Sequence, residues 1–386
     1  MRILHVIANM ALRYGGPQVA CTGLTASLAA RGHDVRVLTT NQDGKDILPL
    51  PVNKQVWHDG VIYRYYKIHT PRFWSTSLGL GRALYEEIPL ADIVHVHNLY
   101  LFHTLIACSI ARMKRIPFIV SPHGALMAHT YHHHRLRKEL LEQLYEKRNL
   151  AVASAIHFAS DMEKSEAEQN MTFRHTATIP WGITLPITFP DRNNDEESFN
   201  WAQLSKSRIV LFLGRLHDFK APDMLLRSFY RVLDKISDVQ LVIAGTGESK
   251  YISYLKMLAE SFGISNNIIW CGMISGQQKK EMLQRAAVCV VPSRVDSYSF
   301  VVLESMASGT PLVVSDRVGL ADKVNCYGVG LVTELDPESL AEAICRILDD
   351  RSLSDGMSHK GPSYIAEHYD WSQIVLKFEQ LYESLL

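Results

Sequence analysis

Short apolar runs alternate with helical patterns along almost the whole chain, and this alternation restricts the fold more than any other feature of the sequence. Most runs are apolar at consecutive positions, as strands buried on both faces of a sheet should be. Strands that alternate with helices form right-handed βαβ units, so the sequence predicts an α/β fold with parallel sheets. The predicted strands are Ile3–Ala8, Asp34–Thr40, Ile62–Ile68, Ile93–Val96, Phe118–Val120, Ala155–Phe158, Ile209–Leu213, Val239–Ala244, Ile268–Cys271, Val288–Val291, Pro311–Val314 and Gly330–Val332.

A polar, proline-bearing stretch between Thr184 and Gln203 interrupts this alternation near the middle of the chain. Its composition is typical of a linker. A domain usually takes about 100–200 residues, so a chain of 386 residues suits two domains. We expect an N-terminal domain of residues 1–185, a linker of residues 186–202, a C-terminal domain of residues 203–370 and a helical tail of residues 371–386.

Composition and charge exclude several classes of protein. Hydrophobic residues make up 47% of the chain and charged residues 21%, so it can bury a full core. Lysine plus arginine equals aspartate plus glutamate at 40 each, which argues against a general nucleic-acid binder. The six cysteines show no C-x-x-C spacing and are expected to be buried, reduced thiols. The first apolar run is too short for a signal peptide, and no window holds 18 apolar residues. We therefore expect a cytoplasmic protein that could still contact a membrane from its surface.

Two cations follow the first predicted strand of the second half. Strand Ile209–Leu213 leads into Gly214-Arg215, and Lys220 lies five residues later. Ligands of open α/β sheets bind at the carboxyl ends of strands. Arg215 can make a forked contact to a phosphate, and Lys220 can act as a point charge. The pair suits a diphosphate, although an ordinary solvated loop with two surface cations explains it equally well.

Two carboxylates follow strand Val288–Val291. The segment from Phe300 to about Gly309 is predicted to be helical, and the N–H groups of its first turn suit an anion. Glu304 lies one turn into this helix and can accept hydrogen bonds from two hydroxyls, while Asp296 in the preceding loop can accept others. The alternative is that Asp296 caps the helix and Glu304 faces solvent. The apolar neighbours of Glu304 make a solvated position less favourable.

With these residues in view, the sequence resembles the retaining glycosyltransferases of family 4, which have the GT-B fold. The resemblance covers nearly the whole chain, and the order of its motifs is specific. The motifs are Gly15-Gly16, His97, Ser121-Pro122-His123-Gly124, Gly214-Arg215 with Lys220, Gly245-x-Gly247, and an E-x7-E-like run from Pro292-Ser293 through Asp296, Glu304, Ala307, Gly309, Thr310 and Pro311.

The resemblance implies two Rossmann-like domains that face a cleft, with the C-terminal helix returning to the N-terminal domain. It assigns His123 and Asp296 to the reaction centre and His97 to the acceptor side. It assigns the donor diphosphate to Arg215 and Lys220, the ribose to Glu304 and the base to the loop at Met273. The remaining donor-binding residues that it implies are Gly15, Gly16, Ser297, Tyr298, Ser299, Phe300 and Val301.

The chain departs from the family pattern at three positions. Asp296 replaces a usual Glu, Ser299 replaces a usual Gly, and Trp181 stands where an Asn is usual. These changes affect the sugar site more than the nucleotide site. No strand is followed by Asp-x-Asp, so no metal is expected. Adjacent helical residues point about 100° apart, so the run His132-His133-His134 is not expected to hold one ion.

The expected substrates are a nucleotide-sugar and a glycan or lipid-linked acceptor of polysaccharide biosynthesis, with no separate cofactor. UDP-glucose is the leading donor and GDP-mannose the next, on family frequency alone. Residues 131–149 read as a basic helix that suits anionic lipids, or equally as a solvated basic face on a helix packed by its leucines. A GT-B nucleotide-sugar epimerase and a non-catalytic binding module remain alternatives. An NAD-dependent oxidoreductase is disfavoured, because the Gly-x-Gly-x-x-Gly pattern is missing after the first strand.

Overall fold

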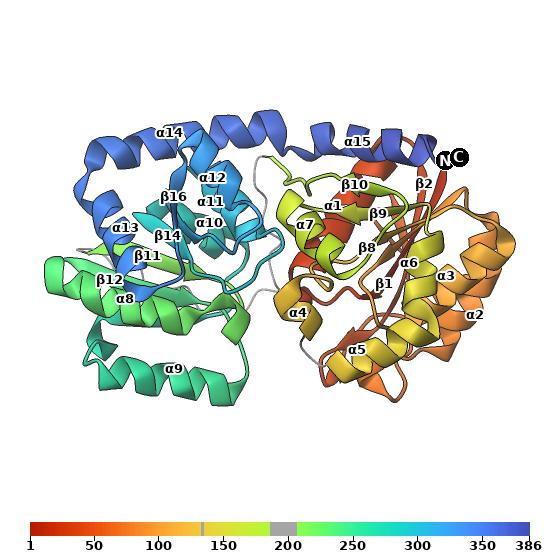
Figure 1. Ribbon diagram of the computed structural model, residues 1–386, viewed down its shortest axis with the longest axis horizontal. Helices are drawn as coiled ribbons and strands as arrows, with labels where there is room; N and C mark the ends of the chain where they lie inside the picture. The colour runs from red at the N-terminus through yellow and green to blue at the C-terminus, as the bar shows by residue number, and fades with distance from the viewer. Residues whose placement is uncertain (133–134, 186–206) are drawn as a thin grey trace. The chain divides into compact units, whose positions relative to one another are not determined.

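Parallel sheets form the centres of the two units into which the chain divides (Figure 1). The computed structural model describes residues 1–132, 135–185 and 207–386. The first unit comprises Met1–Gly182 with Trp371–Leu386, and the second comprises Ile183–Asp370. Residues 186–202, which we expect to be a linker, lie outside the described residues.

The first unit contains an eight-stranded sheet of order β10-β9-β8-β7-β1-β2-β6-β5. Neighbouring strands are parallel except at one edge, where β5 runs antiparallel to β6. The predicted strands of this half are all present. The sequence did not predict the edge strands β5 and β10, nor a small hairpin of β3 and β4, because these segments lack a continuous apolar run. The strands are β1 (Arg2–Asn9), β2 (Asp34–Thr40), β3 (Gln42–Asp43), β4 (Asp46–Ile47), β5 (Gln55–His58), β6 (Val61–Tyr66), β7 (Ile93–His97), β8 (Phe118–Ser121), β9 (Ala155–Phe158) and β10 (Thr176–Thr178).

Helices cover the faces of this sheet (Figure 1). Pro17 lies in the first turn of α1, and Gly32 follows its end with a φ of 89°, as the sequence predicted for this helix. None of the helices in the described part of the chain is long and apolar enough to cross a membrane. The helices of the unit are α1 (Gly16–Ala30), α2 (Leu78–Glu87), α3 (Phe102–Lys114), α4 (Ala128–His132), α5 (Arg135–Leu141), a π-helical turn (Glu142–Glu146), α6 (Lys147–Val152), α7 (Asp161–Asn170) and α15 (Trp371–Glu383).

The second unit contains a six-stranded, fully parallel sheet of order β13-β12-β11-β14-β15-β16. Its strands are β11 (Arg208–Leu213), β12 (Val239–Ala244), β13 (Ile268–Gly272), β14 (Val288–Val291), β15 (Leu312–Ser315) and β16 (Gly330–Thr333). Its helices are α8 (Pro222–Lys235), α9 (Ser249–Ser261), α10 (Gly276–Arg285), α11 (Phe300–Ala307), α12 (Ala321–Tyr327), α13 (Pro337–Asp349) and α14 (Arg351–His368). The order places β11 between β12 and β14, so the chain changes direction across the sheet at β11.

The last helix, α15, belongs to the first unit and packs against α1 (Figure 1). The Trp371 indole lies where side chains at Gly23 and Gly182 would be, since Cβ atoms built there would lie 2.2 and 2.6 Å from its ring. Glu379 accepts hydrogen bonds from Arg31 at 2.6 Å and from His33 at 2.7 Å. The helical tail that the sequence predicted is therefore an integral part of the first unit.

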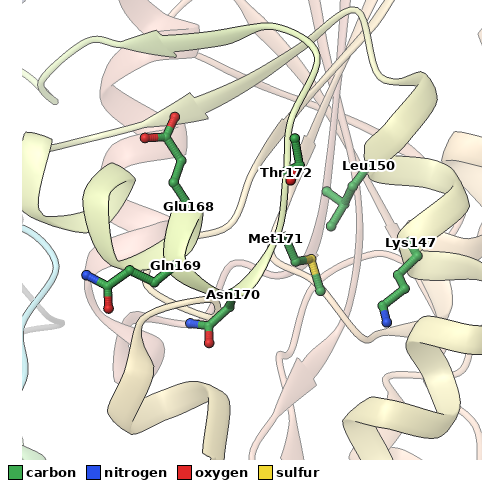
Figure 2. Close-up of a pocket in the computed structure, with 7 residues that line it drawn as sticks. All are labelled: Lys147, Leu150, Glu168, Gln169, Asn170, Met171 and Thr172. Carbon is green, nitrogen blue, oxygen red and sulfur yellow. The ribbon is translucent and has the colours of Figure 1, made fainter.

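A surface pocket of about 390 Å³ lies between α6 and the end of α7 in the first unit (Figure 2). Lys147 and Leu150 line one side of it, and residues 168–172 line the other. Apart from Lys147, which lies in the predicted basic helix of residues 131–149, none of these residues belongs to a motif found in the sequence.

Candidate functional site

Most of the predicted donor-binding residues lie at one edge of the second unit's sheet. In parallel sheets the carboxyl ends of neighbouring strands meet at the same edge, where ligands of open α/β sheets bind. Here β13, β12, β11 and β14 are consecutive neighbours. The segments that follow them contain Met273, Gly245, Arg215 and the run from Pro292 to Ser299, respectively.

The two glycines of Gly245-x-Gly247 are required by close backbone packing. Gly245 has a φ of 154°, and a Cβ atom built on it would lie 1.7 Å from the carbonyl oxygen of Gly214. A Cβ atom on Gly247 would lie 2.0 Å from the carbonyl oxygen of Leu216. The Leu216 N–H also donates to the Thr246 carbonyl at 2.8 Å. The glycines therefore hold the loop after β12 against the loop that contains Arg215.

Lys220 and Asp296, which the sequence predicted separately, form an ion pair. Their side chains are 26% and 11% exposed. Lys220 ends the short turn Asp218–Lys220, and the Asp296 N–H donates to the Arg317 carbonyl at 3.2 Å. The alternative in which Asp296 caps the following helix is wrong, because Ser299 occupies the N-cap of α11 and no side chain caps it. The carboxylate is instead held beside a predicted phosphate-binding cation.

Glu304 lies on α11 and accepts a hydrogen bond from the Lys279 ammonium group at 2.6 Å through Oε1. Its side chain is 12% exposed, so the alternative that it faces solvent is wrong. Its second oxygen, Oε2, is buried and has no hydrogen-bond partner within the described residues. An unpaired buried acceptor costs about 1–3 kcal/mol, a cost that a ligand hydroxyl would remove. Sequence reasoning missed Lys279, which lies on α10 outside every recognised motif.

The other predicted cation, Arg215, is exposed. Another arginine that the sequence did not single out, Arg294, makes a forked contact to Asp223 at 2.9 and 2.7 Å. Burial alone would raise the pKa of Asp223, but the hydrogen bond and charge of Arg294 outweigh burial and lower it. The backbone N–H of Arg294 also donates to the Phe219 carbonyl at 2.8 Å. This bond connects the segment before Asp296 to the turn that ends at Lys220.

The segment before α11 has a strained backbone at the position where the family usually has glycine. Ser299 has φ and ψ of 69° and 89°. A residue with a side chain is disfavoured in this region, which glycine enters freely. Tyr298 and Ser299 are buried, at 4% and 8% exposure, whereas Ser297, Phe300 and Val301 are partly exposed. The Ser-for-Gly departure therefore falls where the backbone conformation itself favours glycine.

The predicted residues of the first unit also lie at the carboxyl edge of its sheet. Gly15 and Gly16 follow β1, His97 ends β7 and His123 follows β8, and these three strands are neighbours. Gly15 has a φ of 68°, and Gly16 begins α1. His123 has a φ of 52° and stacks on Trp181, with ring centroids 5.3 Å apart and planes 8° apart.

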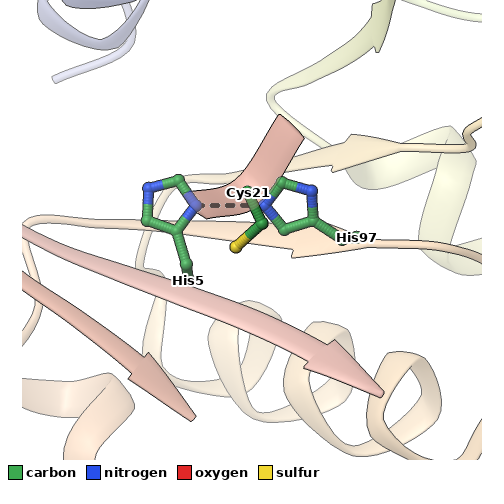
Figure 3. A group of neighbouring side chains, drawn as sticks. All are labelled: His5, Cys21 and His97. Atoms are coloured by element: carbon green, nitrogen blue, oxygen red, sulfur yellow. Dashed lines mark hydrogen bonds between the residues drawn. The ribbon is translucent and has the colours of Figure 1, made fainter. Parts of the chain in front are cut away.

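Three histidine rings form a hydrogen-bonded chain that runs from His123 into the core. His97 Nδ1 lies 3.0 Å from His123 Nε2, and His97 Nε2 lies 3.0 Å from His5 Nδ1 (Figure 3). The His97 side chain is fully buried. The His97 ring lies beneath His123 and contacts the two other rings, and its expected place on the acceptor side stays a prediction.

A second buried chain connects α15 to β9. Tyr382 is 2.7 Å from His95 Nδ1, and His95 Nε2 is 2.7 Å from Ser121 Oγ. Ser121 Oγ lies 2.8 Å from His157 Nδ1, and His157 Nε2 donates to the Ile179 carbonyl at 2.7 Å. Because a carbonyl can only accept, every hydrogen bond in this chain of neutral groups has a fixed direction.

Burial keeps the histidines of both chains neutral. It lowers the pKa of His5 to about 3, and burial followed by the nearby His157 lowers that of His123 to about 3. The pKa values of His95 and His97 lie well below their usual range, chiefly because of burial. At neutral pH the imidazole rings of both hydrogen-bonded chains are therefore uncharged.

His5, Cys21 and His97 are the one group of metal-ligating side chains that the described residues bring together, with ligand atoms within 4.8 Å of one another (Figure 3). The sequence missed this group because its members lie far apart in the chain. Burial raises the pKa of the Cys21 thiol far above its usual range, so the thiol stays protonated. Of the triple-histidine run, His133 and His134 lie outside the described residues. Cys21, Cys108, Cys289 and Cys345 are buried free thiols as expected, whereas Cys271 is partly exposed and Cys326 is exposed.

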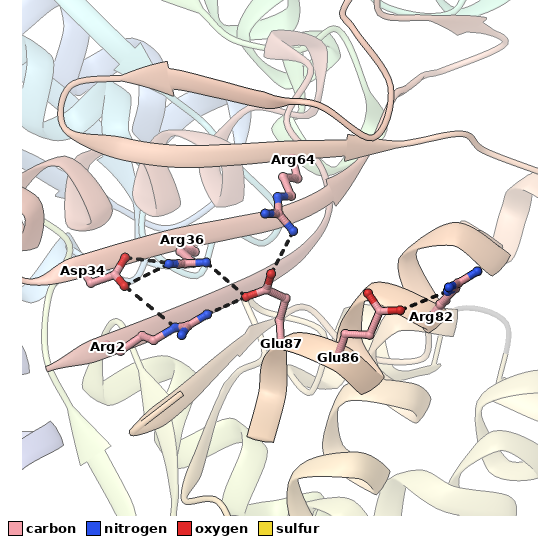
Figure 4. A network of polar contacts seen from close by, with 7 residues as sticks. All are labelled: Arg2, Asp34, Arg36, Arg64, Arg82, Glu86 and Glu87. Atoms are coloured by element: carbon pink, nitrogen blue, oxygen red, sulfur yellow. Dashed lines mark hydrogen bonds and ion pairs between the residues drawn. The ribbon is translucent and has the colours of Figure 1, made fainter. Parts of the chain in front are cut away.

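A cluster of charges in the first unit lies near the opposite edge of its sheet (Figure 4). Glu87 at the end of α2 accepts from Arg2 at 2.7 Å, Arg36 at 3.3 Å and Arg64 at 2.8 Å. Asp34 binds Arg36 at 3.1 Å. Arg2 and Asp34 begin β1 and β2, so the cluster links strand beginnings and lies away from the strand ends at which ligands bind.

The predicted basic helix of residues 131–149 is divided into α5, a π-helical turn and α6. Its apolar side chains do not all pack inward: Leu136, Leu140 and Leu144 are 84%, 57% and 67% exposed. The alternative of a helix packed by its leucines therefore fails for three of the four leucines of residues 131–149, and only Leu141 packs against the core. We call Leu136, Leu140 and Leu144 the leucine stripe.

Family models match both halves of the chain. Residues 15–182 match a model described as Glycosyl transferase 4-like domain, and residues 193–364 match one described as Glycosyl transferases group 1. An uncharacterized glycosyltransferase of Methanocaldococcus jannaschii is 25% identical over 96% of this chain and 94% of its own length. A D-inositol 3-phosphate glycosyltransferase of Corynebacterium diphtheriae is 26% identical over 95% of this chain and 89% of its own.

Solved structures show the same fold over the whole chain. Sucrose-phosphate synthase from Thermosynechococcus elongatus aligns with a TM-score of 0.77 and 21% identity, covering 100% of this chain and 99% of its own. Anabaena HepE in complex with UDP-glucose aligns with a TM-score of 0.79 and 15% identity, covering 100% of both chains. The fold is therefore GT-B, built from two Rossmann-like domains, as the resemblance implied. The first half matches the glycosyl transferase 4-like model and the second half matches the group 1 model. This chain therefore belongs to the family 4 glycosyltransferases, which have the GT-B fold.

Proposed function

We propose that this glycosyltransferase moves a hexose from a nucleotide-sugar, with UDP-glucose as the leading donor, to a glycan or lipid-linked acceptor of polysaccharide biosynthesis. The observation that carries the proposal is the half-satisfied Glu304 carboxylate. Lys279 fixes its Oε1, and its buried Oε2 has no partner within the described residues. A ribose hydroxyl donates the hydrogen bond that this oxygen lacks. HepE was solved with UDP-glucose and is similar in fold, which supports the same donor here.

Lys220 and Arg215 would bind the donor diphosphate. Lys220 is already held at the strand edge by Asp296, and Arg215 is exposed on the adjoining loop. Fixed cations beside a leaving diphosphate stabilise the charge that develops as the glycosidic bond breaks. With two cations and the N-terminus of α11 available, we propose that turnover needs no metal.

The donor cations are tested by the variants Arg215→Ala and Lys220→Ala. Loss of one preorganised electrostatic contact costs roughly 2–4 kcal/mol, so each variant should lower kcat/KM by about 30- to 1,000-fold. Arg231→Ala is the matched control, because Arg231 pairs with Glu338 in an exposed contact on the same unit. Full activity of both test variants would place the phosphate site elsewhere.

The metal requirement is tested by titrating EDTA against the initial rate. We expect the rate to persist in excess chelator. A complete loss that Mg²⁺ or Mn²⁺ restores would overturn the metal-free proposal.

The family resemblance implies that the product keeps the anomeric configuration of the donor. The motif Ser121-Pro122-His123-Gly124 contains no carboxylate. The Glu163 carboxylate that contacts it is buried and accepts hydrogen bonds from the Gly124 and Ala159 N–H groups, so it is not presented as the nucleophile of a double displacement. We infer attack on the face from which the diphosphate leaves, with the departing phosphate taking the acceptor proton. His123 would position the sugar. NMR of the product tests this inference, and inverted configuration would refute it. Measured separately, kcat should fall more than donor affinity in His123→Ala.

The leucine stripe supports an acceptor at a lipid surface. Arg135 and Lys147 have side chains 62% and 63% exposed and flank the three exposed leucines. Cationic side chains beside an apolar stripe suit anionic lipid headgroups. Cosedimentation with vesicles of anionic or neutral lipid tests the contact. Binding that needs anionic lipid, weakens with salt and is lost in Leu136→Ser/Leu140→Ser supports it. Equal, salt-independent behaviour toward both lipids would remove it.

Incubation of the protein with UDP-glucose in the absence of an acceptor separates the proposed transfer from epimerisation. Conversion of the donor into its epimer would favour the epimerase alternative. A thermal-shift panel of nucleotide-sugars identifies the donor, because a ligand at 100 times its Kd adds about 2.7 kcal/mol of stability.

A further inference from the structure

We propose that His5 and His97 act together as positioning residues that hold His123 in its Nδ1–H tautomer, so that His123 presents a hydrogen-bond donor at its outer nitrogen. The identity of the group that receives this hydrogen bond rests on the proposed function. The tautomer itself is a property of the free protein.

Only two proton arrangements satisfy the chain of neutral rings. In the first, His5 Nδ1–H donates to His97 Nε2, and His97 Nδ1–H donates to His123 Nε2. In the second, both bonds reverse, and His123 Nε2–H donates inward. The arrangements differ at the two free nitrogens. The first leaves a lone pair on His5 Nε2 and a proton on His123 Nδ1, and the second leaves the opposite.

The free nitrogen of His5 distinguishes these arrangements. His5 Nε2 is buried and has no hydrogen-bond partner among the residues described. Buried N–H groups without an acceptor are rare in proteins. An imidazole lone pair without a partner occurs elsewhere in this core. His103 Nε2 donates to the His97 carbonyl at 2.7 Å, which leaves a buried lone pair on His103 Nδ1 with no partner among the described residues. The first arrangement therefore fits the surroundings of His5.

A metal ion held by His5, Cys21 and His97 is the competing interpretation of the same residues (Figure 3). An ion between the rings needs the lone pairs of His5 Nδ1 and His97 Nε2, which would replace the hydrogen bond that joins them. His5 would then carry its proton on Nε2, where the described residues offer no acceptor.

The consequence for His123 concerns its chemistry. Its Nε2 lone pair is occupied by His97, so its outer nitrogen donates and cannot act as a general base without reversing both inner bonds. The group that meets it in a substrate complex must be an acceptor, such as a sugar hydroxyl or ring oxygen. His123 thereby becomes a residue that positions the sugar and does not remove the acceptor proton.

The test is long-range ¹H–¹⁵N correlation NMR of protein labelled at histidine, with His123 assigned from the spectrum of His123→Asn. We expect a protonated Nδ1 and an unprotonated Nε2 at His123 at pH 7.5. A protonated Nε2 in the unmodified protein would overturn the proposal, and so would a stoichiometric metal found by elemental analysis of the purified protein.

Variants of His5 test the coupling. His5→Leu removes the innermost donor, so the His123 signals should shift toward the other tautomer, and kcat should fall by about 2- to 10-fold, as expected for one hydrogen bond. In His5→Asn the amide nitrogen takes the place of Nδ1, so this variant should keep the tautomer and stay within about twofold of the original kcat.

His103→Gln is the matched control, because it changes a buried histidine that hydrogen-bonds to the His97 carbonyl and is not one of the three rings of the chain. Its His123 tautomer should not change, and an equal shift in this control would refute the relay. If the tautomer is as proposed but no nucleotide-sugar is turned over, the proposed function fails and the tautomer assignment remains.

Discussion

Mild acid should unfold the first unit before the second. Among the described residues of the first unit, six histidines have a lowered pKa, with burial as the largest cause. They are His5, His95, His97, His103, His123 and His157. The histidines of the second unit, His217, His359 and His368, are exposed or partly exposed.

The direction follows from the protons that each state binds. Unfolding returns each buried histidine to a pKa near 6.5, so the unfolded chain binds protons that the folded unit excludes. The stabilisation is complete above pH 6.5 and is lost as the pH falls from there toward the folded pKa values. At pH 5 the loss is about 2 kcal/mol for each of the four histidines with a folded pKa of about 3 or 4, or about 8 kcal/mol together, and His95 and His97 act in the same direction.

Two buried glutamates act in the opposite direction. Burial raises the pKa of Glu146 and Glu163 to about 7, so the folded unit binds their protons first and gains about 2 kcal/mol from each at pH 5. The net loss from these groups is therefore about 4 kcal/mol before His95 and His97 add to it, a large part of the 5–15 kcal/mol that holds a typical domain folded. We expect the first unit to unfold between about pH 4.5 and 5.5.

Hydrogen exchange read by mass spectrometry at pH 7.5 and 5.0 measures the two units separately. Peptides from β1 and β7 should lose several kcal/mol of opening free energy, and peptides from β11 and β12 much less. His103→Gln keeps the donor to the His97 carbonyl but cannot titrate, so it should lose about 2 kcal/mol less than the unmodified protein. His58→Gln, at an exposed site, is the control. A total loss below about 2 kcal/mol in the first unit would refute the reasoning, as would an equal loss in His103→Gln.

Three further changes test the second unit. Lys279→Met should raise the donor KM by about 10-fold or more, because Glu304 loses a charged hydrogen bond of about 1.5–3 kcal/mol; steady-state kinetics that match the unmodified enzyme would remove Lys279 from the donor site. Ser299→Gly should stabilise the unit by up to about 1 kcal/mol, since it relieves the left-handed backbone, whereas Ser299→Val should destabilise it; thermal melts in the reverse order would count against strain at this position. Gly245→Ala should cost at least about 3 kcal/mol in urea denaturation, because its methyl group would overlap the Gly214 carbonyl; a cost below about 1 kcal/mol would show that the two loops separate easily.

The fold could be predicted from local patterns, because a buried parallel strand must be apolar at successive positions. The segments that escaped prediction, such as β5, lie at sheet edges and need no continuous apolar run. The donor-side motifs could be located for a related reason: they follow strands, and strand ends meet at one edge.

Side-chain partnerships between distant segments could not be predicted. Nothing local in the sequence joins Lys279 to Glu304, or His5 to His97. His97 illustrates the limit, because the family resemblance assigned it to the acceptor side without indicating which side chains it contacts. Whether a side chain at a strand end points to solvent or into the core depends on the packing of neighbouring strands, and here it points at His5.

The position of α15 has a consequence for the order in which the protein is made. The ribosome synthesises the whole second unit before it reaches Trp371, yet Trp371 fills the space beside Gly23 and Gly182, and Tyr382 supplies the first donor to the buried chain that begins at His95. Until α15 is synthesised, the first unit therefore lacks the Trp371 side chain that packs on α1, and His95 in its core lacks its hydrogen-bond donor. The second unit, whose residues are contiguous, can complete its fold as soon as it leaves the ribosome. The domain translated first is thus the one finished last.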